Sequence, residues 1–294
     1  MKVLVSASSF SCEKAKELAK SKNIELVFNP FSRRLTENEI SELIPDFDGL
    51  LAGLEPLNTN VLKRAKKLKA IARIGVGTDN VDFAAAKSLN IKVSNTPDAP
   101  TEAVAEMTVS ALLSILHRII PSNEIIHNGE WKKIMGSSIK GLNVLIIGYG
   151  RIGRKTAELL MKFGCNILAY DPFQKEYSSK DLKELLGKSD VISIHASGEK
   201  EILTSELFSF IKSGCIILNS ARGKLINEEA LFEAIQRGKV SWFWGDALWT
   251  EPYVGDLVKC KNAILTPHIA TYTVDCRNDM EYQAMSNLIK DLGM

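Results

Sequence analysis

The stretch Val144-Leu145-Ile146-Ile147-Gly148-Tyr149-Gly150-Arg151-Ile152-Gly153 decides the fold of this chain. Its first four residues form a run typical of a buried parallel strand, and a helical pattern begins at Arg154. Gly148 permits a tight turn, Gly150 lets backbone approach a pyrophosphate, and Gly153 lets the helix pack closely on the strand. The first N–H groups of this helix are unpaired donors for anionic oxygens. The stretch therefore predicts a strand, turn and helix that bind a dinucleotide.

A second signal follows at the distance that a dinucleotide requires. The next strand, Asn166 to Tyr170, ends at Asp171, 18 positions after Gly153. A carboxylate here accepts hydrogen bonds from the adenosine ribose hydroxyls and repels the 2'-phosphate of NADP, so we expect NAD as the cofactor. An S-adenosylmethionine-dependent methyltransferase can share such a glycine turn. Residues further along the chain must distinguish the two classes.

The composition is that of an ordinary globular protein. The chain has 294 residues, 45% of them hydrophobic and 24% charged, with a formal net charge of +2. This balance gives no electrostatic footprint for nucleic acid, and no apolar run approaches the roughly 20 residues that span a bilayer. Five scattered cysteines, with no pair at metal-ligand spacing, indicate free thiols in a reducing cytoplasm. We expect a cytoplasmic protein without a membrane span, a secretory signal, a nucleic-acid partner or a metal site.

Short apolar runs alternate with helical patterns on both sides of a turn-forming cluster, Asn95 to Pro100. A long apolar helix is expected from Thr101 to about Ile119, followed by a polar connection over residues 123–141. Strand and helix alternation predicts parallel sheets with helices on both faces. The predicted fold is α/β, with two doubly wound parallel-sheet (Rossmann-like) domains and a cleft between them. Residues 1–95 plus 273–294 are expected in one domain and residues 96–272 in the other.

Three ionisable residues each follow a predicted strand in the second half of the chain. They are Arg222, Glu251 and His268. The carboxyl ends of parallel strands form the ligand crevice of such a sheet, so these residues can converge beside a nicotinamide. Reduction of a 2-oxo acid needs a cation that clamps a carboxylate and a proton donor for the carbonyl oxygen, roles that suit Arg and His. A carboxylate bonded to the histidine would favour the imidazolium form, which is the role expected of Glu251.

These residues lie in motifs that together resemble the D-isomer-specific 2-hydroxyacid dehydrogenase family, and within it most closely the catalytic core of D-3-phosphoglycerate dehydrogenases. The motifs occur in the family's order between about residues 70 and 270. They are Arg73-Ile74-Gly75-Val76-Gly77-Thr78-Asp79-Asn80-Val81-Asp82, Asn95-Thr96-Pro97, Val104-Ala105-Glu106, the glycine turn with Asp171, Asn219-Ser220-Ala221-Arg222-Gly223, Asp246 with Glu251-Pro252, and Thr266-Pro267-His268.

The resemblance implies a role for each matching residue. Arg222, Glu251 and His268 would be the catalytic trio. The domain of residues 1–95 and 273–294 would bind substrate, with Val76 and Gly77 receiving its carboxylate on backbone N–H groups. Arg73 would reach a distal anion of the substrate, and Asp246 would bond the nicotinamide carboxamide. The full set of expected cofactor-binding residues is Gly148, Gly150, Arg151, Ile152, Gly153, Asp171, His195, Ala221, Asp246 and Val104.

Several positions depart from the family pattern. A second arginine that some phosphoglycerate enzymes use falls on Gly53, followed by Leu54 and Glu55, which puts recognition of a phosphate in doubt. The loop after His195 is a few residues short. Strand alternation places Trp242 and Trp244 on one face, where we expect packing rather than substrate stacking. Trp249 is close enough to Glu251 in sequence to crowd the pocket.

The predicted function is NAD-linked interconversion of a D-2-hydroxy acid and a 2-oxo acid, with 3-phosphoglycerate among the candidate substrates. Two alternatives stay open. One is a non-catalytic NAD-sensing interaction protein, because transcriptional corepressors share this fold and these motifs. The other is a dehydrogenase for a nonphosphorylated hydroxy acid in a specialised pathway. By resemblance, the helix from Thr101 and the segment of residues 123–141 would form a homodimer interface.

Overall fold

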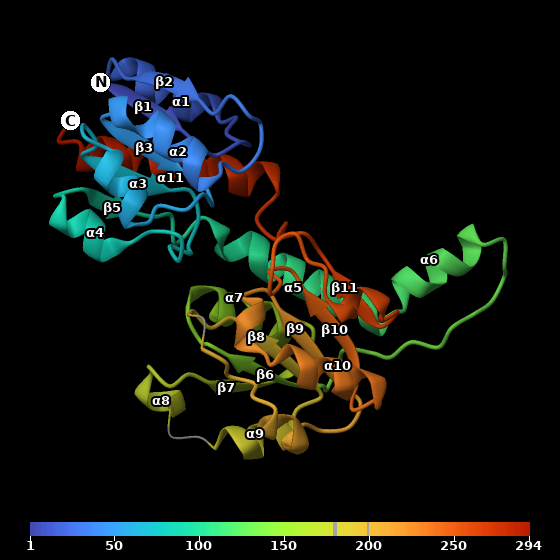
Figure 1. Ribbon diagram of the computed structural model, residues 1–294. Coiled ribbons are helices and arrows are strands. Elements are labelled where there is room, and N and C mark those ends of the chain that lie inside the picture. The colour runs from blue at the N-terminus through green and yellow to red at the C-terminus, as the bar shows by residue number, and fades with distance from the viewer. Residues whose placement is uncertain (179–180, 199) are drawn as a thin grey trace. The chain divides into compact units, whose positions relative to one another are not determined.

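A computed structural model of the chain (Figure 1) describes residues 1–178, 181–198 and 200–294. The chain divides into two compact units, residues 1–100 with 272–294 and residues 101–271. The expected divisions fell after residues 95 and 272. Residues 96–100 stay with the first unit because Thr96 is bonded to it: Gly75 N donates to Thr96 Oγ1 at 2.8 Å, and Thr96 N donates to Gly75 O at 3.1 Å.

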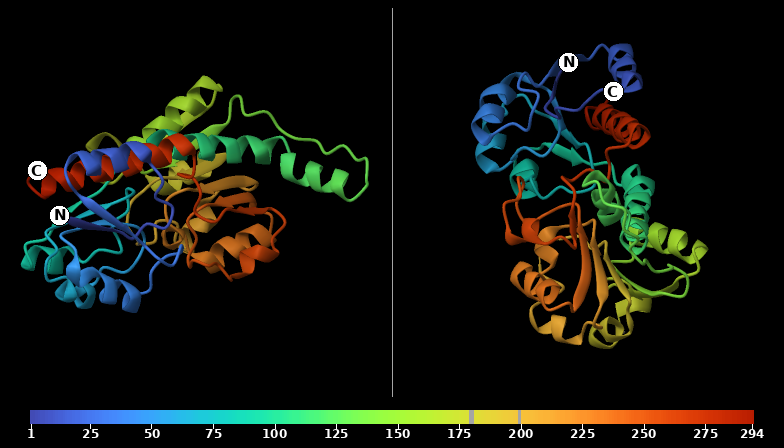
Figure 2. Two further views of the ribbon diagram at one scale, coloured as in Figure 1. Left: turned by 90° about the horizontal axis from the view of Figure 1, so that it is seen from above. Right: turned by 90° about the vertical axis from the view of Figure 1, so that its right-hand side faces the viewer.

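Unit 1 contains a five-stranded parallel sheet in the order β2-β1-β3-β4-β5. Helices α1 and α11 pack together on one face and lie side by side in Figure 2. Buried residues of α2, α3 and α4 form one core with strand side chains of the other face. The elements are β1 Lys2–Val5, α1 Glu13–Ser21, β2 Glu25–Phe28, α2 Glu37–Leu43, η1 Ile44–Asp46, β3 Gly49–Ala52, α3 Thr59–Arg64, β4 Ala70–Arg73, α4 Phe83–Ser88, β5 Lys92–Ser94 and α11 Val274–Asp291.

Unit 2 contains a six-stranded parallel sheet in the order β11-β10-β9-β8-β6-β7. Its elements are α5 Pro100–Leu116, which begins at the unit boundary, α6 Ile119–His127, β6 Asn143–Ile147, α7 Arg151–Lys162, β7 Asn166–Tyr170, α8 Lys175–Ser178, α9 Leu182–Lys188, β8 Val191–Ile194, η2 Glu206–Phe210, β9 Cys215–Asn219, η3 Gly223–Leu225, α10 Glu228–Gln236, β10 Val240–Gly245, η4 Asp256–Lys259 and β11 Ala263–Leu265.

Alternation along the strands of unit 2 creates two cores. In β6, Val144 and Ile146 pack with α5 and α7, whereas Leu145 and Ile147 pack with α9 and α10. Both faces of the sheet are thus buried, which explains why β6 is an unbroken apolar run. Two parallel-sheet α/β domains were predicted from this kind of pattern, and that fold class is confirmed.

The apolar helix after Thr101 is shorter than expected. It ends at Leu116, and Arg118 takes a left-handed backbone (φ 56°) before α6 begins at Ile119. The guanidinium of Arg118 lies 5.3 Å from the ring centre of Trp242, which helps to fix this break. Helix α6 has no buried residue and stands away from the sheet of unit 2 in Figure 1.

Among the described residues, no single helix is long and apolar enough to cross a bilayer. Only α5 and α6 taken together reach that length and hydropathy, and they are bent by 60° at their junction.

Candidate active site

The candidate site of unit 2 lies along one row of strand ends. Strand pairing places Tyr170, Ile147, Ile194, Asn219, Gly245 and Leu265 side by side across the sheet. Each is the last residue of its strand. The predicted glycine turn, Asp171, His195, Arg222, Glu251 and His268 all follow this row within a few residues. The topology therefore gathers them at the carboxyl edge of one sheet, where open α/β sheets bind ligands.

The glycine turn has the geometry that its sequence predicts. Gly148 has φ 89°, and a Cβ there would lie 2.5 Å from the backbone nitrogen of Ala196. A Cβ on Gly153 would lie 2.1 Å from the carbonyl oxygen of Gly148, so only glycine lets α7 approach the turn this closely. Gly150, at the N-cap of α7, faces open space. Arg151 is exposed and Ile152 half-buried in the first turn of the helix. The free space and the helix N-terminus fit a bound pyrophosphate.

Asp171 is buried beside this turn. Its Oδ2 accepts hydrogen bonds from Tyr149 N at 2.9 Å and Gln174 Nε2 at 2.8 Å, and its Oδ1 accepts one from Phe173 N at 2.9 Å. Burial opposes ionisation, but these hydrogen bonds outweigh it and hold the pKa of Asp171 below its ordinary value. Arg154 reaches Gln174 with an Nη2–Oε1 distance of 2.7 Å. The sequence did not reveal this nearby cation, because Arg154 precedes Asp171 by a whole strand and helix.

Arg222 is held by a side-chain bridge within its own turn. Asn219, fully buried at the end of β9, accepts a hydrogen bond from Ala221 N at 3.0 Å and donates one to Arg222 O at 2.8 Å. Gly223 lets the neighbouring segment approach, since a Cβ there would lie 2.4 Å from Trp249 N. This contact fixes the loop that leads to Glu251 against the turn that carries Arg222. Neither Asn219 nor Gly223 was given a role from the sequence, although both lie in a motif that was recognised.

His268 and Glu251 are in direct contact. The distance from His268 Nδ1 to Glu251 Oε1 is 2.8 Å, and both side chains are about one-third exposed, at 33% and 38%. With Nδ1 bonded to the carboxylate, Nε2 is the ring nitrogen available for proton exchange. The pair that the sequence placed on two different loops is thus a hydrogen-bonded dyad.

Asp246 is engaged by the loop that carries His268. Its Oδ1 accepts hydrogen bonds from Thr266 Oγ1 at 2.6 Å and Ile269 N at 2.9 Å, and its Oδ2 accepts one from Ala270 N at 2.9 Å. The residue is 1% exposed. Its carboxylate therefore braces the 266–270 loop, a function that the resemblance did not indicate.

His195 is clasped between two serines. Ser193 Oγ lies 2.8 Å from its Nε2, and Ser220 Oγ lies 3.0 Å from its Nδ1. Burial lowers the pKa of the imidazole to about 3, so the ring is neutral at physiological pH. The neutral imidazole, hydrogen-bonded at both ring nitrogens, thus links the end of β8 to the turn before Arg222. The sequence did not predict these two hydrogen bonds, because Ser193 lies within an apolar strand and Ser220 in a turn, with no local signal that they face His195.

The remaining predicted residues of unit 2 are mostly buried. Val104 lies in α5 at 5% exposure, and Ala221 is 9% exposed. Trp242 and Trp244 both pack in the core between the sheet, α5 and α7, as packing residues would. Trp249 turns toward the opposite core, where its Nε1 donates to Ile226 O at 2.9 Å.

Unit 1 carries the predicted substrate-binding residues at the end of β4 and on the loop that follows it. Val76 is 42% exposed, and Asn95 Nδ2 donates to its carbonyl oxygen at 2.7 Å. Gly77 follows on the same loop. Arg73 is buried and donates from Nη1 to Ile74 O; a Cβ on Gly75 would collide with that guanidinium.

Gly53, where some family members have a second arginine, lies beside a carboxylate. Gly53 N donates to the carboxylate of Glu55, at 3.2 Å to Oε1 and 3.1 Å to Oε2, and Ser6 Oγ donates to Oε1 at 2.5 Å. Glu55 is 1% exposed, and burial raises its pKa. The polar group beside Gly53 is therefore a buried carboxyl rather than a cation.

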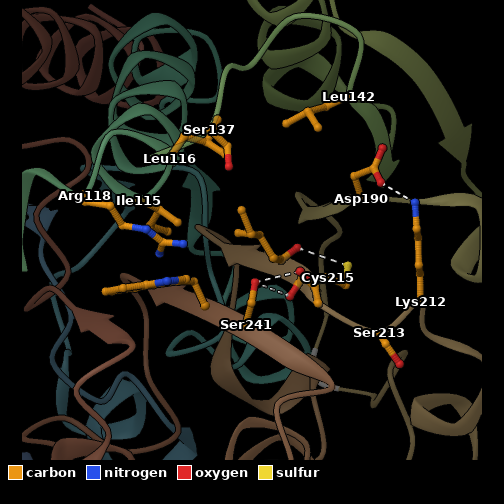
Figure 3. Close-up of a pocket in the computed structure, with 13 residues that line it drawn as sticks. Ile115, Leu116, Arg118, Ser137, Leu142, Asp190, Lys212, Ser213, Cys215 and Ser241 are labelled. Carbon is orange, nitrogen blue, oxygen red and sulfur yellow. Dashed lines mark hydrogen bonds and ion pairs between the residues drawn. The ribbon is translucent and has the colours of Figure 1, made fainter. Parts of the chain in front are cut away.

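A separate hollow of about 280 Å³ opens at the other edge of the unit 2 sheet (Figure 3). It is lined at the amino ends of β8, β9 and β10, and Asp190 and Lys212 form an ion pair of 2.6 Å there. Because strand ends of opposite polarity lie on opposite edges of a parallel sheet, this hollow is distinct from the site of Arg222 and His268.

Fold and site together are those of a dinucleotide-binding α/β protein with a carboxylate–imidazole pair at the carboxyl edge of its sheet. A family model described as "D-isomer specific 2-hydroxyacid dehydrogenase, NAD binding domain" matches residues 109–270. The chain is 33% identical over 277 residues to a hydroxypyruvate reductase of Thermotoga maritima, covering 90% of each sequence. It is 35% identical to a D-3-phosphoglycerate dehydrogenase of Archaeoglobus fulgidus, covering 81% of this chain and 48% of that protein.

Among solved structures, the crystal structure of the TT0316 protein from Thermus thermophilus superimposes with a TM-score of 0.91 at 32% identity, covering 100% of this chain and 97% of that one. The chain belongs to the D-isomer-specific 2-hydroxyacid dehydrogenase family. Its cofactor is NAD, and its reaction class is oxidation and reduction at a CH–OH group.

Proposed function

We propose that this enzyme reduces a small, unphosphorylated 2-oxo acid, of the size of hydroxypyruvate or glyoxylate, to the D-2-hydroxy acid. The observation that carries the chemistry is the 2.8 Å contact between His268 Nδ1 and Glu251 Oε1, on loops that follow the strand ends next to the turn of Arg222. The observation that disfavours a phosphorylated substrate is the buried carboxyl of Glu55 beside Gly53.

We propose the following roles. NADH, when bound, would supply a hydride for C2 of the 2-oxo acid. Arg222 clamps the carboxylate and polarises the carbonyl, because its planar fork matches both oxygens. His268 donates the proton from Nε2 to the carbonyl oxygen as the C–H bond forms, and Glu251 holds the imidazolium and its orientation. Within unit 1, the backbone N–H groups of Val76 and Gly77 would bind a carboxylate. Arg73, which was predicted to reach a distal anion, donates to Ile74 O at the start of their loop.

For the cofactor, we propose that Gly148, Gly150, Arg151, Ile152 and Gly153 surround the pyrophosphate and that Asp171 accepts the ribose hydroxyls. Open space at Gly150 and the lowered pKa of Asp171 support these roles. Val104, His195, Ala221 and Asp246 would line the rest of the cofactor site.

We further propose a cytoplasmic homodimer. All five cysteines are buried and free, as suits a reducing compartment. Helix α6 and the segment after it expose large apolar side chains, including Trp131 at 88% and Met135 at 90%. Exposed large apolar side chains concentrated in one segment favour a subunit interface.

The test is the initial rate of NADH oxidation with a panel of glyoxylate, hydroxypyruvate, pyruvate and 3-phosphohydroxypyruvate. We expect kcat/KM for hydroxypyruvate to exceed that for its phosphorylated analogue by at least about tenfold, since the side chain bonded to Gly53 N is the buried carboxyl of Glu55. The opposite preference would indicate a phosphoglycerate-type enzyme. No turnover with any acid, despite NADH binding, would indicate a non-catalytic NAD sensor.

A further inference from the structure

We infer that Trp244 is a positioning residue for His268, acting through the hydroxyl of Thr266 and the carboxylate of Asp246. This inference rests on the proposed function, because it concerns how the proton donor is held. Each link in the chain is a hydrogen bond within unit 2.

The first two links have a fixed direction. The indole Nε1 of Trp244 donates to Thr266 Oγ1 at 3.2 Å, and Thr266 Oγ1 donates to Asp246 Oδ1 at 2.6 Å. An indole N–H can only donate, so the threonine oxygen must accept from it. The single hydroxyl hydrogen is then directed to Asp246. The tryptophan thereby fixes the rotation of the hydroxyl.

The next links reach the proton donor. Asp246 accepts hydrogen bonds from Ile269 N and Ala270 N, each at 2.9 Å, and its backbone oxygen accepts one from His268 N at 2.9 Å. His268 has a left-handed backbone with φ 56°. A residue other than glycine keeps such a conformation only where its surroundings determine it. Asp246 supplies that constraint on both sides of the histidine.

Trp244 gives this chain a rigid origin. It is fully buried in β10, between its partner strands β9 and β11, in the core shared with α5 and α7. A large side chain in a close-packed core has one position, so its N–H is a fixed donor. Trp242, two residues earlier on the same face, is half-buried, and its ring contacts Arg118 instead. It is therefore the matched control.

The experiment compares Trp244→Phe with Trp242→Phe. Phenylalanine keeps an aromatic ring but lacks the indole donor. We expect Trp244→Phe to lower kcat for 2-oxo acid reduction about three- to tenfold, with an unchanged KM for NADH, as loss of one hydrogen bond predicts. Trp242→Phe should leave kcat unchanged. Equal kcat losses in the two variants, or a loss confined to the KM for NADH, would overturn the inference.

Thr266 provides a rescue test. Thr266→Val removes the hydroxyl and should lower kcat by at least as much as Trp244→Phe, whereas Thr266→Ser keeps the hydroxyl and should retain most of the activity. In Thr266→Val, the further change Trp244→Phe should have no added effect, because both act through one chain. Additive losses would contradict a single chain.

A spectroscopic readout separates this inference from the proposed function. The imidazole resonances of His268 can be identified by their loss in His268→Gln and recorded by NMR without substrate. We expect Trp244→Phe to shift these resonances, because a displaced ring loses part of its 2.8 Å contact with Glu251. Trp242→Phe should not shift them. An inactive protein that shows this shift would refute the function alone, and an active one without it would refute the inference.

Discussion

At the residue scale, the proposed chemistry of the site depends on one contact and one cation. The imidazole of His268 bonds Glu251 through Nδ1, and in the proposed reaction Nε2 donates to the substrate oxygen. His268 follows β11, and Arg222 follows β9, which is separated from β11 by β10 in the sheet. The turn of Arg222 is closed by a hydrogen bond from Asn219. Each of these side chains has a distinct measurable consequence.

Replacement of Glu251 by Gln should weaken its contact with His268. An amide of similar shape keeps a hydrogen-bond acceptor but removes the negative charge that attracts the imidazole N–H. We expect kcat for 2-oxo acid reduction to fall at least about tenfold, because the proton donor loses its charged partner at 2.8 Å. The exposed Glu42→Gln is the control. A kcat equal to that of the parent would refute the pairing.

Replacement of Arg222 by Lys should act on the oxo acid and not on the dinucleotide. A point charge cannot reproduce a planar, bidentate clamp. We predict that kcat/KM for hydroxypyruvate falls by about ten- to a hundredfold while the dissociation constant of NADH, measured by fluorescence, stays within about twofold. Unchanged kinetics with the 2-oxo acid would count against the clamp.

At the element scale, the row of strand ends explains why distant parts of the sequence meet. Six strands end in register, and the loops that follow them approach one another because glycines remove side chains at the contacts. Gly148 faces the backbone after β8, and Gly223 faces the backbone of residues 248–249. Both contacts can be tested by adding a methyl group.

Gly223→Ala should displace the loop that carries Glu251. The new Cβ would lie 2.4 Å from Trp249 N and 2.6 Å from Leu248 C, and both are backbone atoms that cannot rotate away. We expect a loss of about 1–3 kcal/mol in the free energy of unfolding together with a reduced kcat. Gly187→Ala in α9, whose nearest contact is 3.6 Å, should keep or slightly raise stability (~0.5–1 kcal/mol). If both variants unfold at the parent's denaturant concentration, the proposed clash is absent.

The serine-clasped ring of His195 should make stability depend on pH. Its pKa is about 3 in the folded chain, against an ordinary value of 6.5, so the unfolded chain binds the proton first. The stabilisation is complete above about pH 6.5 and declines as the pH falls toward 3, by at most about 1.4 kcal/mol per pH unit. Urea unfolding between about pH 7 and 5 should therefore show a smaller decline for His195→Gln than for the parent.

The exposed His127→Gln serves as the control for His195, since it should decline in parallel with the parent. Parallel curves for all three proteins would show that His195 is not held neutral by the fold.

At the scale of the whole molecule, two parallel sheets could be predicted from the sequence because central strands such as β3 and β6 are buried on both faces and contain apolar runs. The glycine turn was predictable because each glycine has the surroundings that its place in the motif requires. Gly148 and Gly153 lie against backbone atoms, and Gly150 faces open space. The sequence did not reveal the links made by Asn219, Thr266 and the two serines at His195. These polar side chains are short, and they bond either within their own turn, as Asn219 does, or across to a neighbouring strand end, as Thr266 does. Nothing in the local pattern distinguishes them from ordinary turn residues.

The boundary after residue 95 was placed too early for a similar reason. The turn-forming cluster of residues 95–100 marks where the chain changes direction. The hydrogen bonds between Thr96 and Gly75 place this cluster in unit 1. Likewise, the left-handed Arg118 divides a helix that hydropathy alone would continue.

The exposed arm of residues 119–138 predicts self-association. We expect sedimentation velocity to give the mass of two chains, and Trp131→Asp to shift the protein toward monomer, because a charge would be buried in an apolar interface. Phe83→Asp, at an apolar position that is 51% exposed in unit 1, should leave the mass unchanged. A monomeric parent protein would contradict the homodimer.

Transfer of deuterium from NADH that carries deuterium at both C4 positions of its nicotinamide to C2 of hydroxypyruvate would report on cofactor, substrate and proton donor together. We predict D-glycerate with a single deuterium, and a rate at least about a hundredfold lower in His268→Gln although NADH still binds. Unlabelled product, product of the L configuration, or an undiminished rate in His268→Gln would contradict the proposed reaction.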